Sequence, residues 1–396
     1  MIVYADNAAT TCLSSTAKEA MLPYFDQIYG NPSSLHHFGQ EAAMALQEAR
    51  DTVAKLLNAP STREIYFTSG GSEADNQALL SAASFGARKG KQHIISTKFE
   101  HHAILHTLDK LEKRGFEITL LDVHENGIVR LEELEQAIRE DTALVTIMFA
   151  NNEIGTIQPI AEIGAICRKK GVLFHTDAVQ AVGHIPVDIQ ATNIDMLSLS
   201  GHKFHGPKGV GVLYCRSGIP LVNVIEGGAQ ERGKRAGTEN IPAIMGMAAA
   251  MQEACDRLPE TMTYVSALRD KVISGLSKIP HSILNGDRNQ RVPGTINFCF
   301  EGIEGESLLL LLDAKGIAAS SGSACTSGSL DPSHVLLSLG LPHEVAHGSL
   351  RLSIGEYNTE KEIDHIIRTI PEVVSYLRSI SPVWEDLETG KRTHII

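Results

Sequence analysis

The stretch Met196-Leu197-Ser198-Leu199-Ser200-Gly201-His202-Lys203 carries a lysine just beyond a short apolar run and a glycine. The run is typical of a buried strand, so the lysine stands where the chain leaves that strand. Burying an ammonium group is costly, and a lysine at such a position either extends its amine to water or is used chemically. A desolvated lysine can form a Schiff base with a carbonyl group.

The same kind of run recurs throughout residues 63–214, where it alternates with amphipathic helical stretches. This alternation predicts an α/β fold with a mostly parallel, seven-stranded sheet that helices cover on both faces. The expected strands are residues 64–68, 93–96, 117–121, 144–150, 172–176, 196–200 and 210–214. The expected helices between them are residues 74–89, 102–114, 131–139 and 160–170.

Polar residues gather where these strands end, and in such folds ligands bind outside the carboxyl ends of the strands. Asp177 follows the strand at 172–176, and Lys203 follows the strand at 196–200. A buried carboxylate and a lysine from neighbouring strand ends are the pair that pyridoxal phosphate requires, for its ring nitrogen and its aldehyde. An ordinary Lys–Asp salt bridge explains the two residues equally well at this point.

A second, smaller α+β domain is predicted beyond a glycine-rich break at residues 226–233. We expect the large domain to cover residues 15–258, and the small one to combine residues 1–14, through an N-terminal strand, with residues 259–396. The elements expected after the break are helices at 241–257, 261–278, 306–315 and 360–380 and strands at 295–300 and 350–354.

Composition excludes several classes of function. The formal net charge is −12 and basic residues do not cluster, which argues against nucleic acid as a partner. The apolar runs are too short to span a membrane, and Asp6 interrupts any signal peptide, so we expect a cytoplasmic protein. The six cysteines are scattered without a CxxC pair, which argues against a zinc site or a disulfide framework.

Two loops have ordinary explanations when each is considered alone. Ser69-Gly70-Gly71-Ser72 joins a strand to a helix, and free N–H groups at a helix start bind phosphate well. However, Ser72 followed by Asp75 is also a common capping pattern. His101 and the polar turn at residues 151–155 are equally ambiguous.

The segment Ser320-Ser321-Gly322-Ser323-Ala324-Cys325-Thr326-Ser327-Gly328-Ser329 differs from the other cysteine environments. Its small polar residues cannot form a packed core, so we expect an exposed, mobile loop. An exposed thiol is liable to oxidation, which favours a reactive role for Cys325 over a packing role. The alternative is a tolerated surface cysteine.

Taken together, these motifs resemble the pyridoxal-phosphate-dependent cysteine desulfurases of the NifS/IscS type, in the class V aminotransferase superfamily. The resemblance runs from the first strand to the last helix and implies the transferase fold type I of these enzymes. The long loop at about 321–333 is similar to that of the NifS-like group. The matching segments are residues 5–11, 30–34, 69–76, 151–155, 177–180, 200–209, 235–240 and 321–329.

The resemblance implies a set of residues that bind the cofactor. Lys203 would hold the aldehyde and later act as base at the substrate's Cα, and Asp177 would face the ring nitrogen. His101 would stack on the ring, where an imidazole can also move protons. The other cofactor contacts implied are Asn152, Gln180 at the ring oxygen, and a phosphate site of Gly71, Ser72, Ser200, His202 and, from the other subunit of a homodimer, Thr238.

The resemblance also implies the substrate, L-cysteine, and the route of its sulfur. Asn152 and Arg351 would bind the substrate carboxylate, although an internal salt bridge would also explain Arg351. The Cys325 thiolate would attack the substrate sulfur, leaving a persulfide and alanine. No resident metal is expected, although Cys325 is a candidate ligand for a cluster during assembly.

Other functions remain open on this evidence. A selenocysteine lyase or an aminotransferase could use the same scaffold, and a non-catalytic protein could have kept the fold. The sulfur acceptor, an iron–sulfur scaffold protein or another thio-cofactor pathway, is not specified. The stretch at residues 381–387 could dock such a partner, but its Trp384 could equally serve packing.

Overall fold

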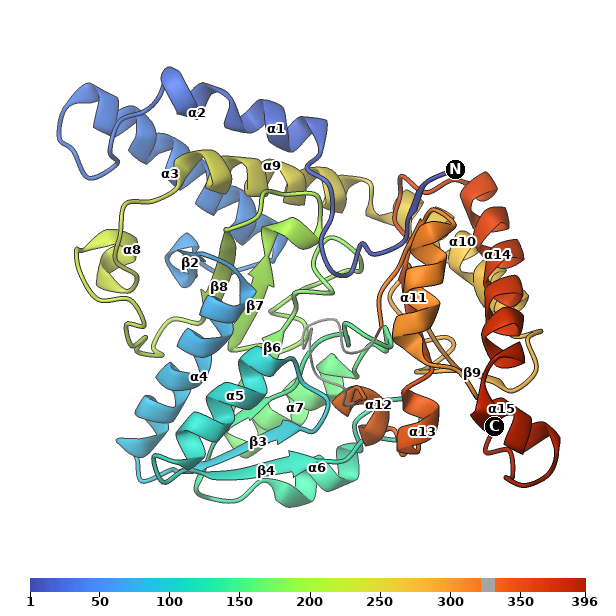
Figure 1. Ribbon diagram of the computed structural model, residues 1–396. Helices are drawn as coiled ribbons and strands as arrows, with labels where there is room; N and C mark the ends of the chain where they lie inside the picture. The colour runs from blue at the N-terminus through green and yellow to red at the C-terminus, as the bar shows by residue number, and fades with distance from the viewer. Residues whose placement is uncertain (322–331) are drawn as a thin grey trace.

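A seven-stranded sheet lies at the centre of the computed structural model, which describes residues 1–321 and 332–396 (Figure 1). Its strands are β2 (Ile65–Thr68), β3 (His93–Thr97), β4 (Glu117–Leu121), β5 (Thr142–Thr146), β6 (Leu173–Asp177), β7 (Met196–Ser200) and β8 (Gly211–Cys215). The spatial order is β2-β8-β7-β6-β5-β3-β4, and only β8 runs antiparallel to its neighbours. The predicted mostly parallel sheet is confirmed.

Helices cover both faces of this sheet, and β3, β5, β7 and β8 are therefore buried along their whole length. Successive residues Ile94 and Ile95 of β3 are fully buried in different core clusters, as expected when side chains alternate between two covered faces. Helices α4 (Gly71–Ala87) and α5 (His102–Glu112) pack in the Ile94 cluster. The other cluster contains α3 (His37–Leu56), α6 (Leu131–Ala137), α7 (Ile160–Lys170) and α9 (Ile241–Asp256).

The region before residue 63 contains helices that the apolar pattern did not predict. They are α1 (Ser15–Met21), α2 (Pro23–Asp26) and the 20-residue α3. The buried face of α3 consists mainly of alanines, among them Ala42, Ala45 and Ala49. The helix is amphipathic, and its small buried side chains allow it to pack closely against α9.

The rest of the chain builds a second core around a three-stranded antiparallel sheet in the order β12-β10-β9. The N-terminal strand pairs in parallel with β11, next to this core, through Val3 and Ile317. The predicted division into two domains remains a prediction. The elements are β1 (Val3–Tyr4), β9 (Ser282–Leu284), β10 (Thr295–Phe300), β11 (Ile317–Ala318), β12 (Ser349–Ser353), α10 (Leu258–Leu276), α11 (Gly305–Ala314) and α14 (Glu360–Ser379).

Short helices complete the fold. They are α8 (Gln230–Gly233), α12 (His334–Ser338), α13 (His343–Ala346) and α15 (Pro382–Glu388), with the 3₁₀ turns η1 (Thr62–Glu64) and η2 (Gly201–Lys203). Within the described ranges, no helix is both long enough and apolar enough to cross a membrane.

The C-terminal tail is held on the second core by hydrogen bonds and ring contacts. His394 Nδ1 lies 2.8 Å from a Glu301 carboxylate oxygen, and its ring stacks on His281 at 3.7 Å. The Arg378 guanidinium lies over the Trp384 ring, with its Cζ atom 3.9 Å from the ring centroid. Trp384 therefore has a packing role, one of the two roles that the sequence left open.

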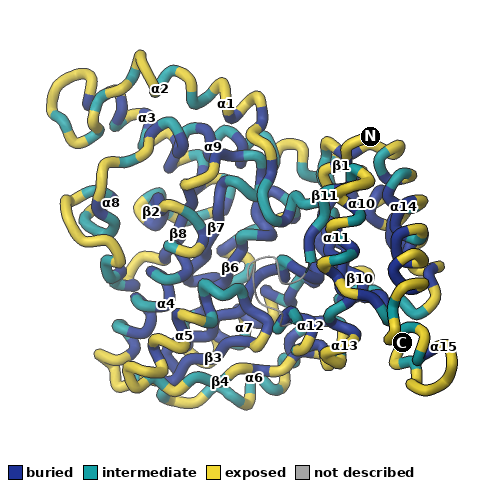
Figure 2. The backbone as a smooth tube through the Cα atoms, viewed as in Figure 1, coloured by how far each residue is buried: buried dark blue, intermediate teal, exposed yellow. Residues whose placement is uncertain are grey.

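A buried ion pair anchors the glycine-rich segment at residues 226–233 to the edge of the large sheet. Glu231 accepts hydrogen bonds from both Arg50 Nη atoms, at 2.6 and 2.8 Å, and from the Phe67 N–H at 2.9 Å. Its side chain is 1% exposed and that of Arg50 is 6% exposed. Glu231 also has a positive φ of 44°, a strained conformation for glutamate, so these bonds hold the backbone there against strain. Figure 2 shows α8 at the edge of the molecule, with the buried strands of the sheet nearer its centre.

We expect the substitution Glu231→Gln to lower the free energy of unfolding by about 3 to 5 kcal/mol, because it leaves the Arg50 charge buried and poorly paired. Urea unfolding at a single protein concentration measures this. The control is Glu117→Gln, which removes a carboxylate from the exposed pair with Arg139 and should have little effect. If both variants lose the same free energy of unfolding, the buried pair does not stabilise the protein more than the exposed one.

Candidate functional site

Lys203 lies in η2, directly after β7, and main-chain carbonyl groups hold its amine. Its Nζ atom donates to Ala8 O at 2.6 Å and to Ala9 O at 2.8 Å. The two acceptors belong to the N-terminal segment, which passes over the end of the large sheet. The half-buried lysine is thus kept at the strand end and does not extend into water.

Asp177 ends β6, the neighbour of β7, and its carboxylate is buried. One of its oxygens accepts the Val179 N–H at 2.9 Å. Burial raises the pKa of Asp177, while His101, this hydrogen bond and Lys203 act in the opposite direction. A further cation beside the carboxylate would therefore stabilise its charged form.

His101 approaches Asp177 from another strand end. It is the N-cap residue of α5, where its Nδ1 accepts the Ala103 N–H at 3.1 Å. Ligand-type atoms of Asp75, His101 and Asp177 lie within 4.8 Å of one another. The structure therefore brings together the carboxylate and the histidine that the sequence analysis proposed.

The N-terminus of α4 offers a position for an anion close to Lys203. Its N-cap residue is Gly70, so no side chain caps the first N–H groups of this described helix. A Cβ atom added to Gly71 would lie 2.6 Å from Val179 Cγ2, and one added to Gly70 would lie 3.7 Å from Ser200 Oγ. Gly70, Gly71 and Ser200 thus meet at the start of the 17-residue helix α4, where backbone N–H groups favour phosphate.

Two other predicted cofactor residues bind the N-terminal segment. Gln180 Nε2 donates to Ala8 O at 3.0 Å, the same carbonyl that Lys203 uses. His202 Nδ1 lies 3.1 Å from Thr10 Oγ1. Burial, with help from Lys203, lowers the pKa of His202 to about 4, so its ring is neutral near pH 7. Both residues border the site.

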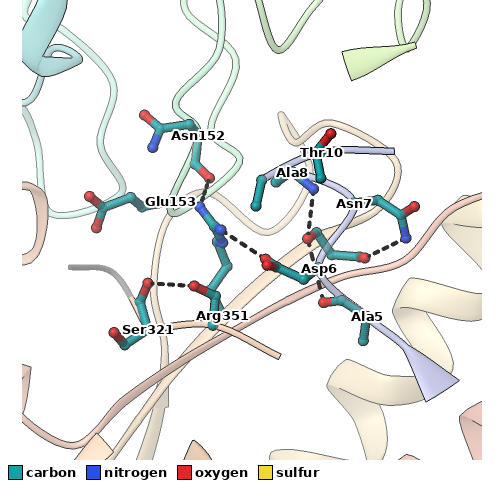
Figure 3. Close-up of polar contacts among 12 residues, drawn as sticks. Ala5, Asp6, Asn7, Ala8, Thr10, Asn152, Glu153, Ser321 and Arg351 are labelled. Atoms are coloured by element: carbon teal, nitrogen blue, oxygen red, sulfur yellow. Dashed lines mark hydrogen bonds and ion pairs between the residues drawn. The ribbon is translucent and has the colours of Figure 1, made fainter. Parts of the chain in front are cut away.

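Arg351 lies on β12 with a buried side chain and two hydrogen-bond partners (Figure 3). Its Nη2 atom pairs with Asp6 Oδ1 at 3.0 Å, and Nη1 donates to Asn152 O at 3.1 Å. The Nε atom is buried and has no hydrogen-bond partner among the described residues. An internal salt bridge therefore exists, and the guanidinium still has a donor available for an anion.

Asn152 and Arg351, the two residues predicted to bind the substrate, contact each other, and Asn151 closes the turn that holds Asn152. Asn152 uses its main-chain oxygen toward Arg351. The preceding Asn151 accepts the N–H groups of Glu153 and Ile154, at 2.8 and 3.0 Å, and so closes the polar turn.

Cys325 lies outside the described residues, but both flanks of its segment are anchored near Arg351. Before it, Ser320 exchanges two backbone hydrogen bonds with Arg351, at 2.7 and 3.1 Å. After it, Ser333 Oγ donates to the Glu153 carboxylate. The described residues on the two sides of positions 322–331 thus bind Arg351 on one side and Glu153, which follows Asn152, on the other.

Thr238 stands apart from the other predicted phosphate contacts. It is exposed in the loop between α8 and α9. The described chain shows no hydrogen bond between Thr238 and Ser72, Ser200 or His202. Arg235 of the same loop binds Glu73, in the first turn of α4, at 2.9 Å.

Sequence reasoning missed several buried polar residues beneath the site. Glu100 is fully buried, and burial raises its pKa to about 8. His175 and Asp75 are also buried, and neither had been given a role. Asp75 appeared only as part of a possible cap, and a lone histidine within a strand carries no functional signal. Asp6 was likewise quoted in a motif without a function.

The site thus combines a lysine after β7, a buried carboxylate at the end of β6 and the start of the helix that follows β2. These three parts match an aromatic ring that carries a cationic nitrogen, an aldehyde and a phosphate, as pyridoxal phosphate does. An arginine with a free donor adds a position for a carboxylate beside them.

Comparisons with known proteins agree with this geometry. The model of the family "Aminotransferase class-V" matches residues 3–366. The chain is 53% identical over 392 residues to the cysteine desulfurase IscS of Clostridium botulinum, covering 98% of each protein. It is 49% identical over 383 residues to the cysteine desulfurase NifS of Azotobacter vinelandii, covering 96% of this chain and 95% of the relative.

Solved structures give the same result. A NifS-like protein superposes with a TM-score of 0.89 at 41% identity, covering 95% of this chain and 100% of that one. SspA in complex with cysteine superposes with a TM-score of 0.80 at 34% identity, covering 90% of this chain and 100% of that one.

Proposed function

Because this chain belongs to the class-V aminotransferase family and is a cysteine desulfurase, we propose that its pyridoxal phosphate is held between Lys203 and Asp177 and that Cys325 takes the sulfur of L-cysteine. The family is one that uses pyridoxal phosphate. The observation that carries the proposal is the placement of Lys203 after β7, Asp177 at the end of the neighbouring β6, and the α4 N-terminus beside Ser200, the last residue of β7.

The described residues fit this cofactor in both charge and space. The Asp177 carboxylate is buried and gains from a facing cation, and the pyridinium nitrogen is such a cation. Gly70 and Gly71 have no side chains where the phosphate would approach α4. When bound, pyridoxal phosphate supplies the electron sink that weakens bonds at the substrate's Cα.

The protein's own groups then have separate roles. Asp177 holds a proton on the ring nitrogen, and His101 lies against the site with its Nδ1 already engaged by Ala103. Lys203 Nζ, kept at the strand end by Ala8 and Ala9, takes the proton from the substrate's Cα. Ser72, Ser200 and His202 line the phosphate end, and Gln180 lies beside Lys203.

Arg351 and Asn152 bind the substrate carboxylate in this proposal. The buried Nε–H of Arg351 has no partner among the described residues and is a charge-assisted donor for a carboxylate. Asp6 and the Asn152 carbonyl orient the guanidinium and limit its other conformations.

The sulfur leaves the substrate through Cys325. Its thiolate forms an S–S bond with the substrate sulfur while the substrate Cβ–S bond breaks, and the carbon is protonated. The balance is L-cysteine plus a protein thiol giving L-alanine plus a protein persulfide. The anchoring of Ser320 and Ser333 beside Arg351 supports delivery of the thiol to the bound substrate.

We expect the purified protein to absorb near ~420 nm, as a Schiff-base cofactor does, and to form alanine and sulfur in equal amounts from L-cysteine. Replacing Cys325 by alanine should keep the absorbance but lower both products at least about 100-fold. The control is Cys12→Ala, since Cys12 is an exposed free cysteine.

The outcomes separate the alternatives. Loss of colour on Cys325→Ala would contradict the division of roles between Cys325 and Lys203. A keto acid with pyridoxamine phosphate would indicate an aminotransferase, and turnover of selenocysteine but not cysteine would indicate a selenocysteine lyase.

Arg351→Lys should raise KM for L-cysteine about 10- to 100-fold, because a single ammonium group cannot reproduce the guanidinium geometry. Steady-state kinetics measure this, and circular dichroism verifies the fold. Arg139→Lys at the exposed pair with Glu117 is the matched control. An unchanged KM in Arg351→Lys would remove Arg351 from the carboxylate site.

The protein acts as a homodimer in this proposal, with Thr238 of one subunit completing the phosphate site of the other. The exposed apolar residues of the N-terminal helical region support such an interface. They are Leu22, Phe25, Tyr29, Leu35 and Met44, each at least 54% exposed.

Sedimentation equilibrium should give twice the 42.8 kDa chain mass. The variant Phe25→Glu should weaken the dimer at least about tenfold, because it introduces a charge into a buried interface, and it should also reduce cofactor retention. Tyr376→Glu, at an exposed aromatic residue far along the chain, is the control. A wild-type monomer with full cofactor content would contradict both the dimer and the role of Thr238.

The persulfide sulfur passes to an acceptor protein for iron–sulfur clusters or other thio-cofactors in this proposal. A cytoplasmic location agrees with the unpaired state of the five cysteines in the described ranges, since reducing compartments keep thiols free.

A further inference from the structure

Asp75 is a buried acid that the proposed mechanism does not use. It lies on α4, and its side chain is 1% exposed. One of its oxygens is hydrogen-bonded by Ser198, while Oδ1 has no partner among the described residues. An oxygen of Asp75 lies within 4.8 Å of one of Asp177. The site therefore contains two carboxyl groups where one pyridinium charge is expected.

The residue nearest to the Asp75 Oδ1 atom is a neutral histidine. His175 Nε2 lies 3.7 Å from that atom, and 3.0 Å from Ser198 Oγ. The other ring nitrogen, Nδ1, lies 2.9 Å from Thr146 Oγ1. Burial lowers the pKa of His175 to about 3, so it carries no positive charge for Asp75 at neutral pH. Thr146, His175 and Ser198 thus orient Asp75 without neutralising it.

Asp177, in contrast, has groups that stabilise its charge. His101, the Val179 N–H and Lys203 all favour its ionised form. Burial raises the pKa of Asp75 well above its ordinary range, and the charge of Asp177 raises it further. Two carboxyl groups this close in a dry interior do not both ionise. The proton therefore resides on the group whose ionised form is less stabilised, which is Asp75.

We propose that Asp75 is a neutral carboxylic acid that acts as a positioning residue, leaving Asp177 as the one carboxylate charge that faces the ring nitrogen. If Asp75 were ionised, the pair would draw another proton into the site, and Asp177 would lose part of its ability to keep the ring nitrogen protonated. The part of this inference that concerns the cofactor rests on the proposed function, whereas the proton on Asp75 is a property of the protein alone.

Infrared difference spectroscopy of the apoprotein at pH 7 tests the proton directly, because a carboxylic acid and a carboxylate have separate carbonyl stretches. Asp75→Asn should remove one carboxylic acid band. Glu100→Gln identifies the band of Glu100, whose pKa burial raises to about 8. Asp109→Asn replaces an exposed acid on α5 and should leave the carboxylic acid bands unchanged. If the carboxylic acid bands are unchanged in Asp75→Asn, the proposal is overturned.

The effect on the site is measured by the ¹⁵N shift of the labelled cofactor's ring nitrogen. Asp75→Asn keeps a neutral polar group and should leave this shift near the wild-type value. Asp75→Val removes the polar group and should move the shift toward neutral pyridine, with kcat lowered about tenfold if the Asp177 pKa changes by one unit. If Asp75→Val does not fold, Ser198→Ala releases the Asp75 carboxyl and should move the shift the same way.

Two results would contradict the positioning role. One is a nitrogen shift that is the same in wild type, Asp75→Val and Ser198→Ala. The other is a large shift change in Asp75→Asn, which would mean that Asp75 is normally charged. Loss of the acid band in Asp75→Asn, together with a wild-type protein that makes no alanine, would support the proton on Asp75 and count against the desulfurase mechanism instead.

Discussion

The contact between the N-terminal segment and Lys203 is the interaction on which the rest of the site depends. Ala8 and Ala9 accept the lysine amine through their carbonyl groups, and Ala8 also accepts Gln180. Two residues earlier, Asp6 pairs with Arg351 on the second core. One short stretch therefore sets the distance between the lysine at the end of the large sheet and the arginine of the smaller one. Because β1 pairs with β11, this stretch is held on the side of the second core.

Burial of charge is the second constraint. Asp177, Asp75 and Glu100 are all enclosed, and burial raises the pKa of each. Charged carboxylates are unfavourable in such surroundings unless a cation accompanies them. The arrangement is therefore best suited to one cationic group beside Asp177, with protons on the other two acids. In the proposed function, the ring bound beside Asp177 would offset this cost, so cofactor binding would stabilise the protein.

Much of the fold followed from short-range patterns. The strands β3 and β7 and the helix α7 match the predicted ranges closely, because strands covered on both faces are rich in apolar residues. The edge strand β4 also matches its predicted range, although it is only partly buried. Helix α3 was not predicted, although its buried residues lie on one face and the helix is amphipathic. The short helices α8 and α13 were also missed, because a single turn leaves too few residues for a period to be recognised.

By itself, the sequence determined which chemical groups stand at the strand ends: Lys203 after β7, Asp177 at the end of β6 and the glycines before α4. These follow from local patterns, since a strand exit, a turn and a helix start each have characteristic residues. Only the tertiary structure decided what those groups contact. The Asp6–Arg351 pair joins residues at opposite ends of the chain, and the approach of Asp75 to Asp177 joins a helix to a strand about 100 residues away. The first contact arises because the N-terminal segment lies between the two cores, and the second because α4 packs on the large sheet; no local pattern encodes either.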